Sequence, residues 1–419
     1  MQTSRADDHI QFLARLGAAM AAANYPVTLI REMLRRASSA YGVSTEFVAL
    51  PNTVQVVGPA TASGTAVKSA SVEADLRFDQ TFPLARLVSA ARKGAVDPAA
   101  GEAELERIRS TRHRLPAWVT VIGYGIWSAG LALVLEPTPL NLLGATVFGL
   151  MVGAIAAVGR GLPLLNQLVP VISAFVVTAL SILAAHRLGL DHIGLRALIP
   201  PLAMFLPGAA LTLAVIELNS RDTISGASRL VAGFVQLAQL AFGIFIAVQV
   251  LGEAESQLSS VAVNKLGSWA PWVGVAVYAF GLMLFLGPPL RFLPWLVVVC
   301  YAAYSAQYLG DLLFGSYVSG FTGGVVLTVC ALAMASRAGA PPAISLILPG
   351  FWLLVPGSMG LIGIAELFGA DGDSAIVVTF ISMFSVAFGL QTGLVCWQLV
   401  RRARRPRRHP GLSSMRPVE

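Results

Sequence analysis

Ten apolar runs follow one another over residues 118–400, and nearly all of them are long enough to form a membrane-crossing helix. Hydrocarbon offers the backbone no hydrogen-bond partners, so a segment that crosses a bilayer must satisfy its own polar groups, as an α-helix does. Only 12% of the residues are charged, against about 25% in soluble domains. The sequence therefore predicts an all-α polytopic membrane protein with ten transmembrane helices. The runs lie at residues 118–135, 140–158, 168–185, 198–218, 230–251, 269–286, 293–306, 318–335, 344–367 and 376–400.

One stretch occurs twice, at a separation of 149 residues. Residues 200–222 read PPLAMFLPGAALTLAVIELNSRD, and residues 349–371 read PGFWLLVPGSMGLIGIAELFGAD. Proline removes a backbone donor and glycine tolerates unusual dihedrals, so both helices are predicted to be kinked or unwound at Pro-Gly in the middle of the run. The shift superposes Pro200 on Pro349, Pro207 on Pro356, Gly208 on Gly357, Glu217 on Glu366 and Asp222 on Asp371.

The two copies imply two repeats, at residues 116–252 and 266–400. Five spans per half is an odd number, so the halves are predicted to insert with opposite orientation, as inverted repeats. Most arginines fall in the loops and tail expected on the inner side. This predicts a protein of the cell (inner) membrane with both termini in the cytoplasm. A broken helix in hydrocarbon should line a cavity, and a pair of them points to the binding site of a transporter.

Residues 1–115 are mixed in composition and are predicted to form a small cytoplasmic α+β domain. An alanine-rich stretch near the start is preceded by Asp7 and Asp8, where a signal peptide has basic residues, and is interrupted by Arg15, so no cleavage is expected. No motif in this domain indicates its task. Its helices are expected behind caps at Asp7 or Asp8 and at Thr28, and at residues 84–92 and 100–109, with a β-hairpin formed by residues 47–58 and 65–76.

The net charge of +7 is concentrated near the ends of the spans and in the tail at residues 401–419, which carries seven arginines. Such basic residues suit anionic lipids at a cytoplasmic membrane surface, so no nucleic-acid partner is expected. Cys300, Cys330 and Cys396 lie in apolar runs without disulfide or metal spacing. The sequence predicts no metal, no cofactor and no catalytic constellation of an enzyme.

Four segments carry a resemblance to a known family: VTLIREMLRRASSAYGVSTEFVALPNTVQVV, FLPGAALT, SRDTISGASRL and PPAISLILPGFWLLVPGSMGL. Together they resemble the threonine/serine exporter family over residues 12–400. The most specific part is LxPGxxLT, followed by an acid and by SGAxRL. The resemblance implies a secondary transporter that expels small polar amino acids, driven by the proton gradient. The matching positions are Pro207, Gly208, Thr212, Glu217, Asp222, Ser225, Gly226, Arg229, Pro349, Gly350, Pro356, Gly357 and Ser358.

The chain departs from the family pattern at Leu213 and Ile216, where members often carry Asn and Arg, and at Ile362, where an Arg is common. A site built to bond a polar group discriminates strongly against its absence. These departures therefore bear on which substrate is carried.

The predicted proton-coupling residues are Glu217, Glu366 and Asp222. A carboxylate inside a membrane is a functional-site hypothesis by default, because charge in hydrocarbon is costly and proton relays use it. Glu217 lies about 15 Å along the helix from Pro207, near the cytoplasmic end. The alternatives are acids that face headgroup water, and a simple pair of Asp222 with Arg229 at the cytoplasmic edge.

The predicted substrate-binding residues surround the two Pro-Gly breaks. A half-helix that begins there exposes backbone N–H groups and the positive end of its dipole to a substrate carboxylate. The alternative is a kink that only eases packing, with hydroxyls bonded inside the helices. The residues are Pro207, Gly208, Thr212, Pro356, Gly357 and Ser358.

Two small-xxx-small spacings, Gly149 with Gly153 and Gly320 with Gly324, predict that helices approach closely at these positions. We interpret them as packing sites rather than as ligand sites.

The interpretation that accounts for most of these features is a secondary active exporter of threonine, serine or a close relative, coupled to proton influx. Rocking of one repeat against the other would alternate access to a substrate held between the broken helices. One alternative is an exporter of small dicarboxylates on the same scaffold, which needs positive charge at the site. Another is a membrane-anchored sensor in which the N-terminal domain acts. A homo-oligomer is compatible with each interpretation.

Overall fold

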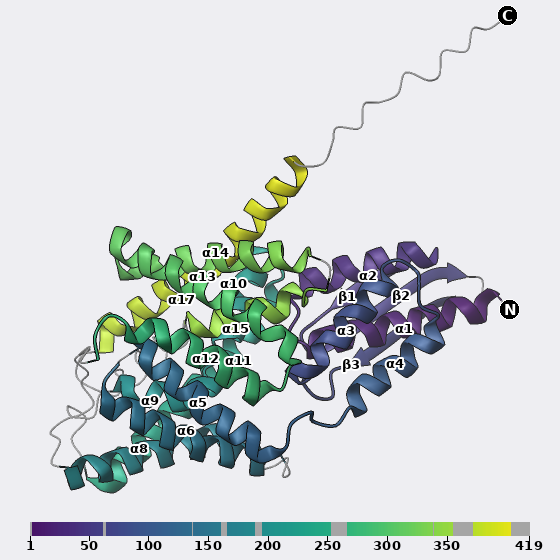
Figure 1. Ribbon diagram of the computed structural model, residues 1–419. Helices are drawn as coiled ribbons and strands as arrows, with labels where there is room; N and C mark the ends of the chain where they lie inside the picture. The colour runs from purple at the N-terminus through teal and green to yellow at the C-terminus, as the bar shows by residue number, and fades with distance from the viewer. Residues whose placement is uncertain are drawn as a thin grey trace, which may run out of the picture.

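The structure is a computed structural model in which helices dominate and one small sheet lies near the N-terminus (Figure 1). The bundle of apolar helices and the sheet-containing unit lie side by side. The described part of the chain comprises residues 2–61, 64–135, 137–160, 166–188, 195–252, 266–337, 339–354 and 372–403.

The N-terminal unit, residues 2–110, packs four helices with an antiparallel sheet of order β1-β2-β3 (Figure 1). The predicted hairpin is confirmed as the pair β2 and β3. Its first strand is divided, because the N–H of Leu50 donates to the carbonyl of Thr53 and closes a turn around Pro51. The elements are α1 (Gln2–Ala22), α2 (Val27–Tyr41), β1 (Glu46–Ala49), β2 (Thr53–Thr61), β3 (Gly64–Ser71), α3 (Phe78–Ala91) and α4 (Pro98–Ser110).

The starts of these helices follow local signals in one case and not in two others. Asp97 accepts from two backbone N–H groups in the first turn of α4 and caps it. The two aspartates predicted to cap α1 lie inside that helix, which begins at Gln2. Thr28 does not cap α2, which begins one residue earlier at Val27, behind Pro26. The first N–H of α2 is therefore left for a partner elsewhere in the fold.

Apolar helices lie at all ten places where the sequence predicts a span. Six described helices are long and apolar enough to cross a membrane, and seven if the bent pair α9–α10 counts as one span. The predicted total of ten stays a prediction. The elements are α5 (Ala117–Leu135), α6 (Pro139–Gly159), α8 (Val169–Leu188), α9 (Leu195–Leu202), η1 (Ala203–Phe205), α10 (Gly208–Asn219), α11 (Thr223–Leu251), α12 (Ala270–Leu286), η3 (Leu290–Phe292), α13 (Leu293–Phe314), α14 (Ser316–Ala335), α15 (Ala343–Leu353) and α17 (Gly372–Ala403).

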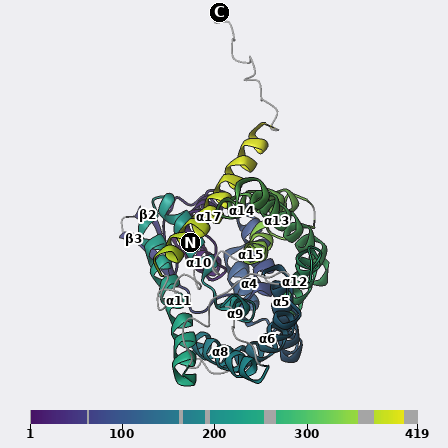
Figure 2. The same cartoon turned by 90° about the vertical axis from the view of Figure 1, so that its left-hand side faces the viewer.

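The apolar helices form a ring in which α9, α10 and α15 lie toward the inside (Figure 2). Neighbouring contacts run from α8 to α6, α5, α12, α13, α14 and α17, and α10 with α11 closes the circle back to α8. Within the ring, α9 packs against α5 and α6, whereas α15 packs against α13 and α14. The two stretches that carry the Pro-Gly repeat therefore begin in the interior of the bundle.

Helices α5 and α12 cross at close range and run antiparallel. A Cβ atom on Gly123 would lie 2.5 Å from the backbone nitrogen of Phe285 near the end of α12. One on Gly130, two turns later in α5, would lie 2.2 Å from the nitrogen of Tyr278, earlier in α12. Such distances leave no room for a side chain, so glycine permits backbone-to-backbone contact here. The matching glycines of α12 are Gly274 and Gly281.

The two small-xxx-small spacings also serve packing, as predicted. Gly149 and Gly153 of α6 lie against α5, and Gly320 and Gly324 of α14 lie against α17. A Cβ atom on Gly324 would stand 2.8 Å from the carbonyl oxygen of Val386.

The N-terminal unit packs directly on the bundle. Phe78 of α3 belongs to the hydrophobic core of the bundle, and its ring meets Phe292 edge-on at 5.9 Å. Phe82 meets the same ring at 5.2 Å. In return, Ile344 at the start of α15 packs against the core of the N-terminal unit. The two hydrophobic cores therefore interdigitate at this junction.

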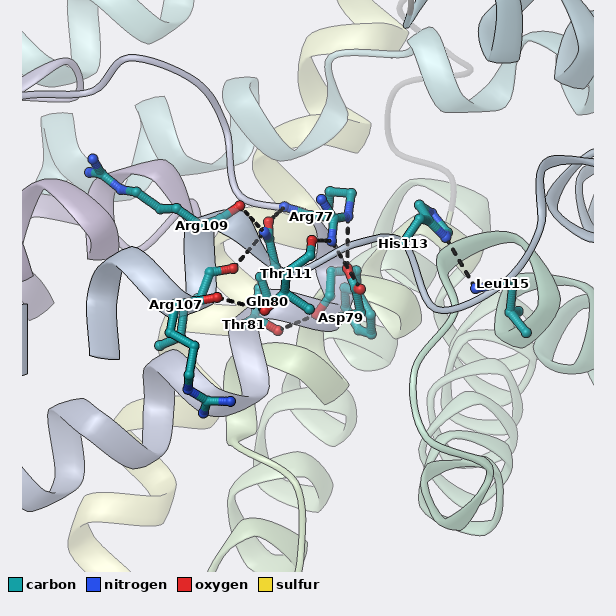
Figure 3. A network of polar contacts seen from close by, with 11 residues as sticks. Arg77, Asp79, Gln80, Thr81, Arg107, Arg109, Thr111, His113 and Leu115 are labelled. Atoms are coloured by element: carbon teal, nitrogen blue, oxygen red, sulfur yellow. Dashed lines mark hydrogen bonds and ion pairs between the residues drawn. The ribbon is translucent and has the colours of Figure 1, made fainter. Parts of the chain in front are cut away.

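Polar side chains hold the connector between α4 and α5 (Figure 3). Gln80 donates from Nε2 to the carbonyls of Ile108 and Arg109. Arg77 donates to the carbonyl of Thr111 at 2.6 Å and pairs with Asp79. These bonds orient the N-terminal unit at the point where the chain enters the bundle.

Candidate functional site

The first Pro-Gly stretch is a broken helix, as the sequence predicts. Helices α9 and α10 meet at an angle of 55°. Leu206 between them is extended, Pro207 is the N-cap of α10, and Gly208 is its first residue. The N-terminus of a twelve-residue helix therefore opens at the break, inside the ring.

Side chains of neighbouring helices bond the backbone at this break. Tyr124 of α5 donates its hydroxyl to the carbonyl of Pro201 at 2.9 Å. Gln236 of α11 donates from Nε2 to the carbonyl of Phe205 at 2.8 Å. An interrupted helix within a membrane needs such partners, because hydrocarbon supplies none.

The second Pro-Gly stretch is described only through its first part. Helix α15 contains Pro349 and ends at Leu353. Tyr278 of α12 donates its hydroxyl to the carbonyl of Pro349 at 2.7 Å. A buried tyrosine from the first helix of each half thus bonds a proline carbonyl in each stretch. The predicted site residues Pro356, Gly357, Ser358 and Glu366 lie outside the described residues.

Thr212 lies one turn after Gly208 and is 3% exposed. Its Oγ1 atom has no hydrogen-bond partner among the described residues. A buried hydroxyl without a partner costs about 1–3 kcal/mol, which makes Thr212 a candidate for bonding a polar ligand.

Glu217 lies in the last turn of α10 and is fully buried, at 0% exposure. Its Oε2 atom accepts from Nε of Arg229 at 3.1 Å, and its Oε1 atom accepts from the backbone N–H of Val27 at 3.2 Å. That N–H is the first of α2, so Glu217 supplies the cap that Thr28 does not. A carboxylate is favourable at a helix N-terminus, where unpaired N–H groups and the helix dipole meet it.

Asp222, the N-cap residue of α11, accepts from Nη2 of Arg31 at 2.7 Å. The alternative that Asp222 pairs with Arg229 is therefore wrong, because each binds another partner. Nearby, burial raises the pKa of the Asp75 carboxyl, and the charge of Arg229 partly opposes that rise. The end of the broken helix thus meets the N-terminal unit through charged groups from both sides.

The SGAxRL motif has a structural explanation in α11. A Cβ atom on Gly226 would lie 2.9 Å from the carbonyl oxygen of Ala214, so glycine lets α11 approach α10 closely. This approach brings Arg229, one turn further along, to the carboxylate of Glu217.

Several contacts at this candidate site were not predictable from the motifs. Val27 and Arg31 lie on a helix face that reads as part of an ordinary amphipathic pattern. Tyr124, Tyr278 and Gln236 could have been noticed as polar groups in apolar helices, since buried tyrosine hydroxyls usually find a partner. Their partners depend on the arrangement of the helices.

Over the described residues, no group of three or more His, Cys, Asp or Glu side chains is placed to hold a metal ion. Along α10 lie a helix N-terminus at the break, the Thr212 hydroxyl, which has no partner among the described residues, and a buried carboxylate–guanidinium pair at the other end. Such a set can bind a small zwitterion and exchange a proton.

A family model described as "Putative threonine/serine exporter" matches residues 11–251. Pheromone-regulated membrane protein 10 of Zygosaccharomyces rouxii is 22% identical over 411 residues, which cover 92% of this chain and 42% of that protein. The protein of the same name from Eremothecium gossypii is 22% identical over 313 residues, covering 70% and 41%. The one from Saccharomyces cerevisiae is 24% identical over 264 residues, covering 61% and 68%.

The chain spans about two fifths of the length of the first two of these fungal relatives. No solved structure gives a significant match to the chain.

Proposed function

The chain belongs to the threonine/serine exporter family, and we propose that it is a secondary active exporter of small polar amino acids, such as threonine and serine, driven by proton influx. The observation that carries the proposal is the break between α9 and α10, which opens a helix N-terminus inside the bundle. One turn further lies Thr212, whose hydroxyl has no partner in the part of the chain that the structure describes. The N-terminus would receive the substrate carboxylate, and the hydroxyl would bond its polar side chain.

Glu217 is the proposed proton carrier. A proton on this carboxylate removes its charge and so weakens the bond to Arg229 and the cap on α2. Proton arrival would therefore loosen the broken helix from the N-terminal unit. Glu366 would carry the matching role in the second half, where Pro356, Gly357 and Ser358 would complete the substrate site.

Alternating access fits two inverted repeats that rock against each other. The antiparallel crossing of α5 and α12 supports this proposal, because they are the first apolar helices of the two halves. The order of helices in the ring supports it as well, since α6 and α13 flank the crossing on opposite sides. We place both termini in the cytoplasm, on the side of the N-terminal unit.

A gating role for the N-terminal unit is a second proposal, favoured by a specific observation. Val27 and Arg31 of α2 bond the two acids at the end of α10 and the start of α11. A unit attached at this point would move whenever the broken helix moves. This contact favours a gate over a sensor that uses the helices only as an anchor.

Transport by the purified full chain in liposomes tests the main proposal. We expect labelled threonine or serine to move faster under an imposed proton gradient, and the acceleration to disappear with a protonophore. Thr212→Val should slow threonine flux about tenfold or more, because the site loses a hydrogen bond to its polar substrate. Thr328→Val is the matched control, since Thr328 is also buried but bonds the carbonyl of Gly324 within α14. Flux of small dicarboxylates alone would instead support the alternative substrate class.

A further inference from the structure

A pocket of about 360 Å³ lies where the N-terminal unit meets the bundle, away from the broken helix. Three segments that are distant in the sequence line it. Helix α3 contributes Phe82 and Arg86, η3 contributes Arg291, and the first turn of α13 contributes Trp295. The segment before α15 contributes prolines, among them Pro342.

Among the described residues that line this pocket, the charged ones are basic. They are Arg86 and Arg291. Neither arginine forms an ion pair or a hydrogen bond with any residue that the structure describes, although Glu104 lies within electrostatic range of Arg86. Two guanidinium groups without a protein partner among the described residues can together bind an anion, and their planar sets of N–H donors suit phosphate oxygens in particular.

The rest of the pocket is apolar and aromatic. The rings of Phe82 and Phe292 meet edge-on at 5.2 Å along its wall, and Trp295 stands beside them. Leu290, between two lining residues, is 73% exposed. An exposed leucine next to a basic pocket fits a ligand that combines a charged head with hydrocarbon.

The place of Arg291 in the chain indicates at which level of the membrane the pocket lies. Arg291 lies in the first turn of Leu290–Phe314, one of the helical segments long and apolar enough to cross a membrane. An arginine and a tryptophan at the end of such a segment belong at the level of the lipid headgroups. The pocket therefore opens where phospholipid phosphates are present at high density.

We propose that this pocket binds the headgroup of one anionic phospholipid, whose phosphate lies between Arg86 and Arg291 and whose acyl chains run past Leu290 along α13. Because one arginine belongs to the N-terminal unit and the other to the bundle, the lipid bridges the two. Anionic lipid at this site would hold the N-terminal unit in its docked position, beside the contacts of Val27 and Arg31.

The experiment compares lipid retention by the full chain and by variants. The protein is purified in detergent with an equimolar mixture of phosphatidylglycerol and phosphatidylcholine, and bound lipids are counted by native mass spectrometry. The intact chain should retain phosphatidylglycerol in preference. Arg86→Gln/Arg291→Gln should reduce that retention on the order of 20-fold, since each basic residue near the membrane surface contributes about fivefold to the binding of anionic lipid.

A matched control separates this pocket from general surface charge. Arg112→Gln/Arg337→Gln removes two exposed arginines that do not line the pocket, one in the connector and one just after α14. It should retain phosphatidylglycerol like the intact chain. The single substitutions at Arg86 and at Arg291, each expected to reduce retention about fivefold, provide the same test if the double variant does not accumulate.

Two results would overturn the proposal. One is equal retention of phosphatidylglycerol by the intact chain and by Arg86→Gln/Arg291→Gln. The other is displacement of the lipid by glycerol phosphate or inorganic phosphate at equal concentration, which would assign the pocket to a soluble phosphate compound. Both readouts are independent of amino acid transport, so they stand apart from the proposed function.

Discussion

Arg229 and Glu217 lie on consecutive helices, and their buried side chains pair from Nε to Oε2 at 3.1 Å. The turn between α10 and α11 contains Arg221 at φ 65°, a left-handed conformation that reverses the chain sharply. The side chains of the pair are 10% and 0% exposed. Because Val27 also donates to Glu217, one carboxylate joins the broken helix, the next helix and the N-terminal unit.

Removing one member of this pair should destabilise the protein strongly. Glu217→Gln is expected to lower the free energy of unfolding by about 3–5 kcal/mol, because Arg229 stays charged and buried but loses its ion-pair partner. The double variant Glu217→Gln/Arg229→Met should cost less than the sum of the two single changes. Thermal unfolding in detergent measures all three. Strictly additive costs would contradict a coupled pair, and Glu46→Gln, at an exposed position, should change nothing.

The crossing of α5 and α12 should tolerate no side chain at its centre. Gly130→Ala would place a Cβ 2.2 Å from the backbone nitrogen of Tyr278, so the helices must separate. We expect a loss of about 1–3 kcal/mol or more, read as a lower unfolding temperature. Gly144→Ala is the control: its nearest neighbour would be 3.7 Å away, and alanine favours the helix. Equal stability of the two variants would show that the crossing is loose.

The two tyrosine hydroxyls should each stabilise a proline carbonyl in the bundle. Tyr124→Phe and Tyr278→Phe keep the buried ring but remove the donor to Pro201 and to Pro349. Each is expected to cost about 1–3 kcal/mol, the penalty for a buried acceptor left unpaired. Tyr308→Phe, at a position 43% exposed, should be neutral. If all three variants unfold at the same temperature, the two hydroxyls do not stabilise the Pro-Gly stretches.

The ion pair of Arg31 with Asp222 should hold the N-terminal unit on the bundle. Arg31→Gln is expected to raise the rate of proteolysis in the connector at residues 111–116 several-fold, because one of the bonds across the junction is lost. The exchange Arg31→Asp/Asp222→Arg should restore much of the protection. Arg35→Gln, on the exposed side of α2, serves as the control. A cleavage rate unchanged by Arg31→Gln would remove the pair from the docking contact.

His113, in the same connector, should make stability depend on pH. Burial lowers the pKa of its imidazole, with the charges of Arg160 and Arg77 adding to the effect and Asp79 opposing it. The unfolded chain therefore takes up this proton first as pH falls below about 6.5. The stability that the neutral imidazole of His113 contributes is complete above that pH, and it is lost progressively as the pH falls from there to the pKa of the folded state.

Unfolding temperatures measured between pH 5 and pH 7.5 check this expectation. His113→Gln should flatten the decline on the acid side. An identical slope for the intact chain and for His113→Gln would refute it.

Much of the fold was predictable because its causes are local. Apolar runs of helix length can satisfy their backbone only as helices in a membrane, and Pro207 with Gly208 cannot continue one, so the break between α9 and α10 follows from residue types. The packing roles of Gly149 and Gly324 follow from four-residue spacing in the same way. Helix caps were less predictable, since the cap of α2 is not Thr28 but a carboxylate from another part of the chain.

The sequence by itself determined which segments are apolar helices, where the first Pro-Gly stretch bends and which acids are candidates for a buried site. Only the tertiary structure decided the partners of those acids. Glu217 meets a backbone N–H 190 residues away, and Asp222 meets Arg31 across 191 residues. Backbone breaks and hydrophobic runs depend on neighbouring residues, whereas the partner of a buried charge depends on which surfaces pack together. Which surfaces pack together is determined by the fold of the whole chain.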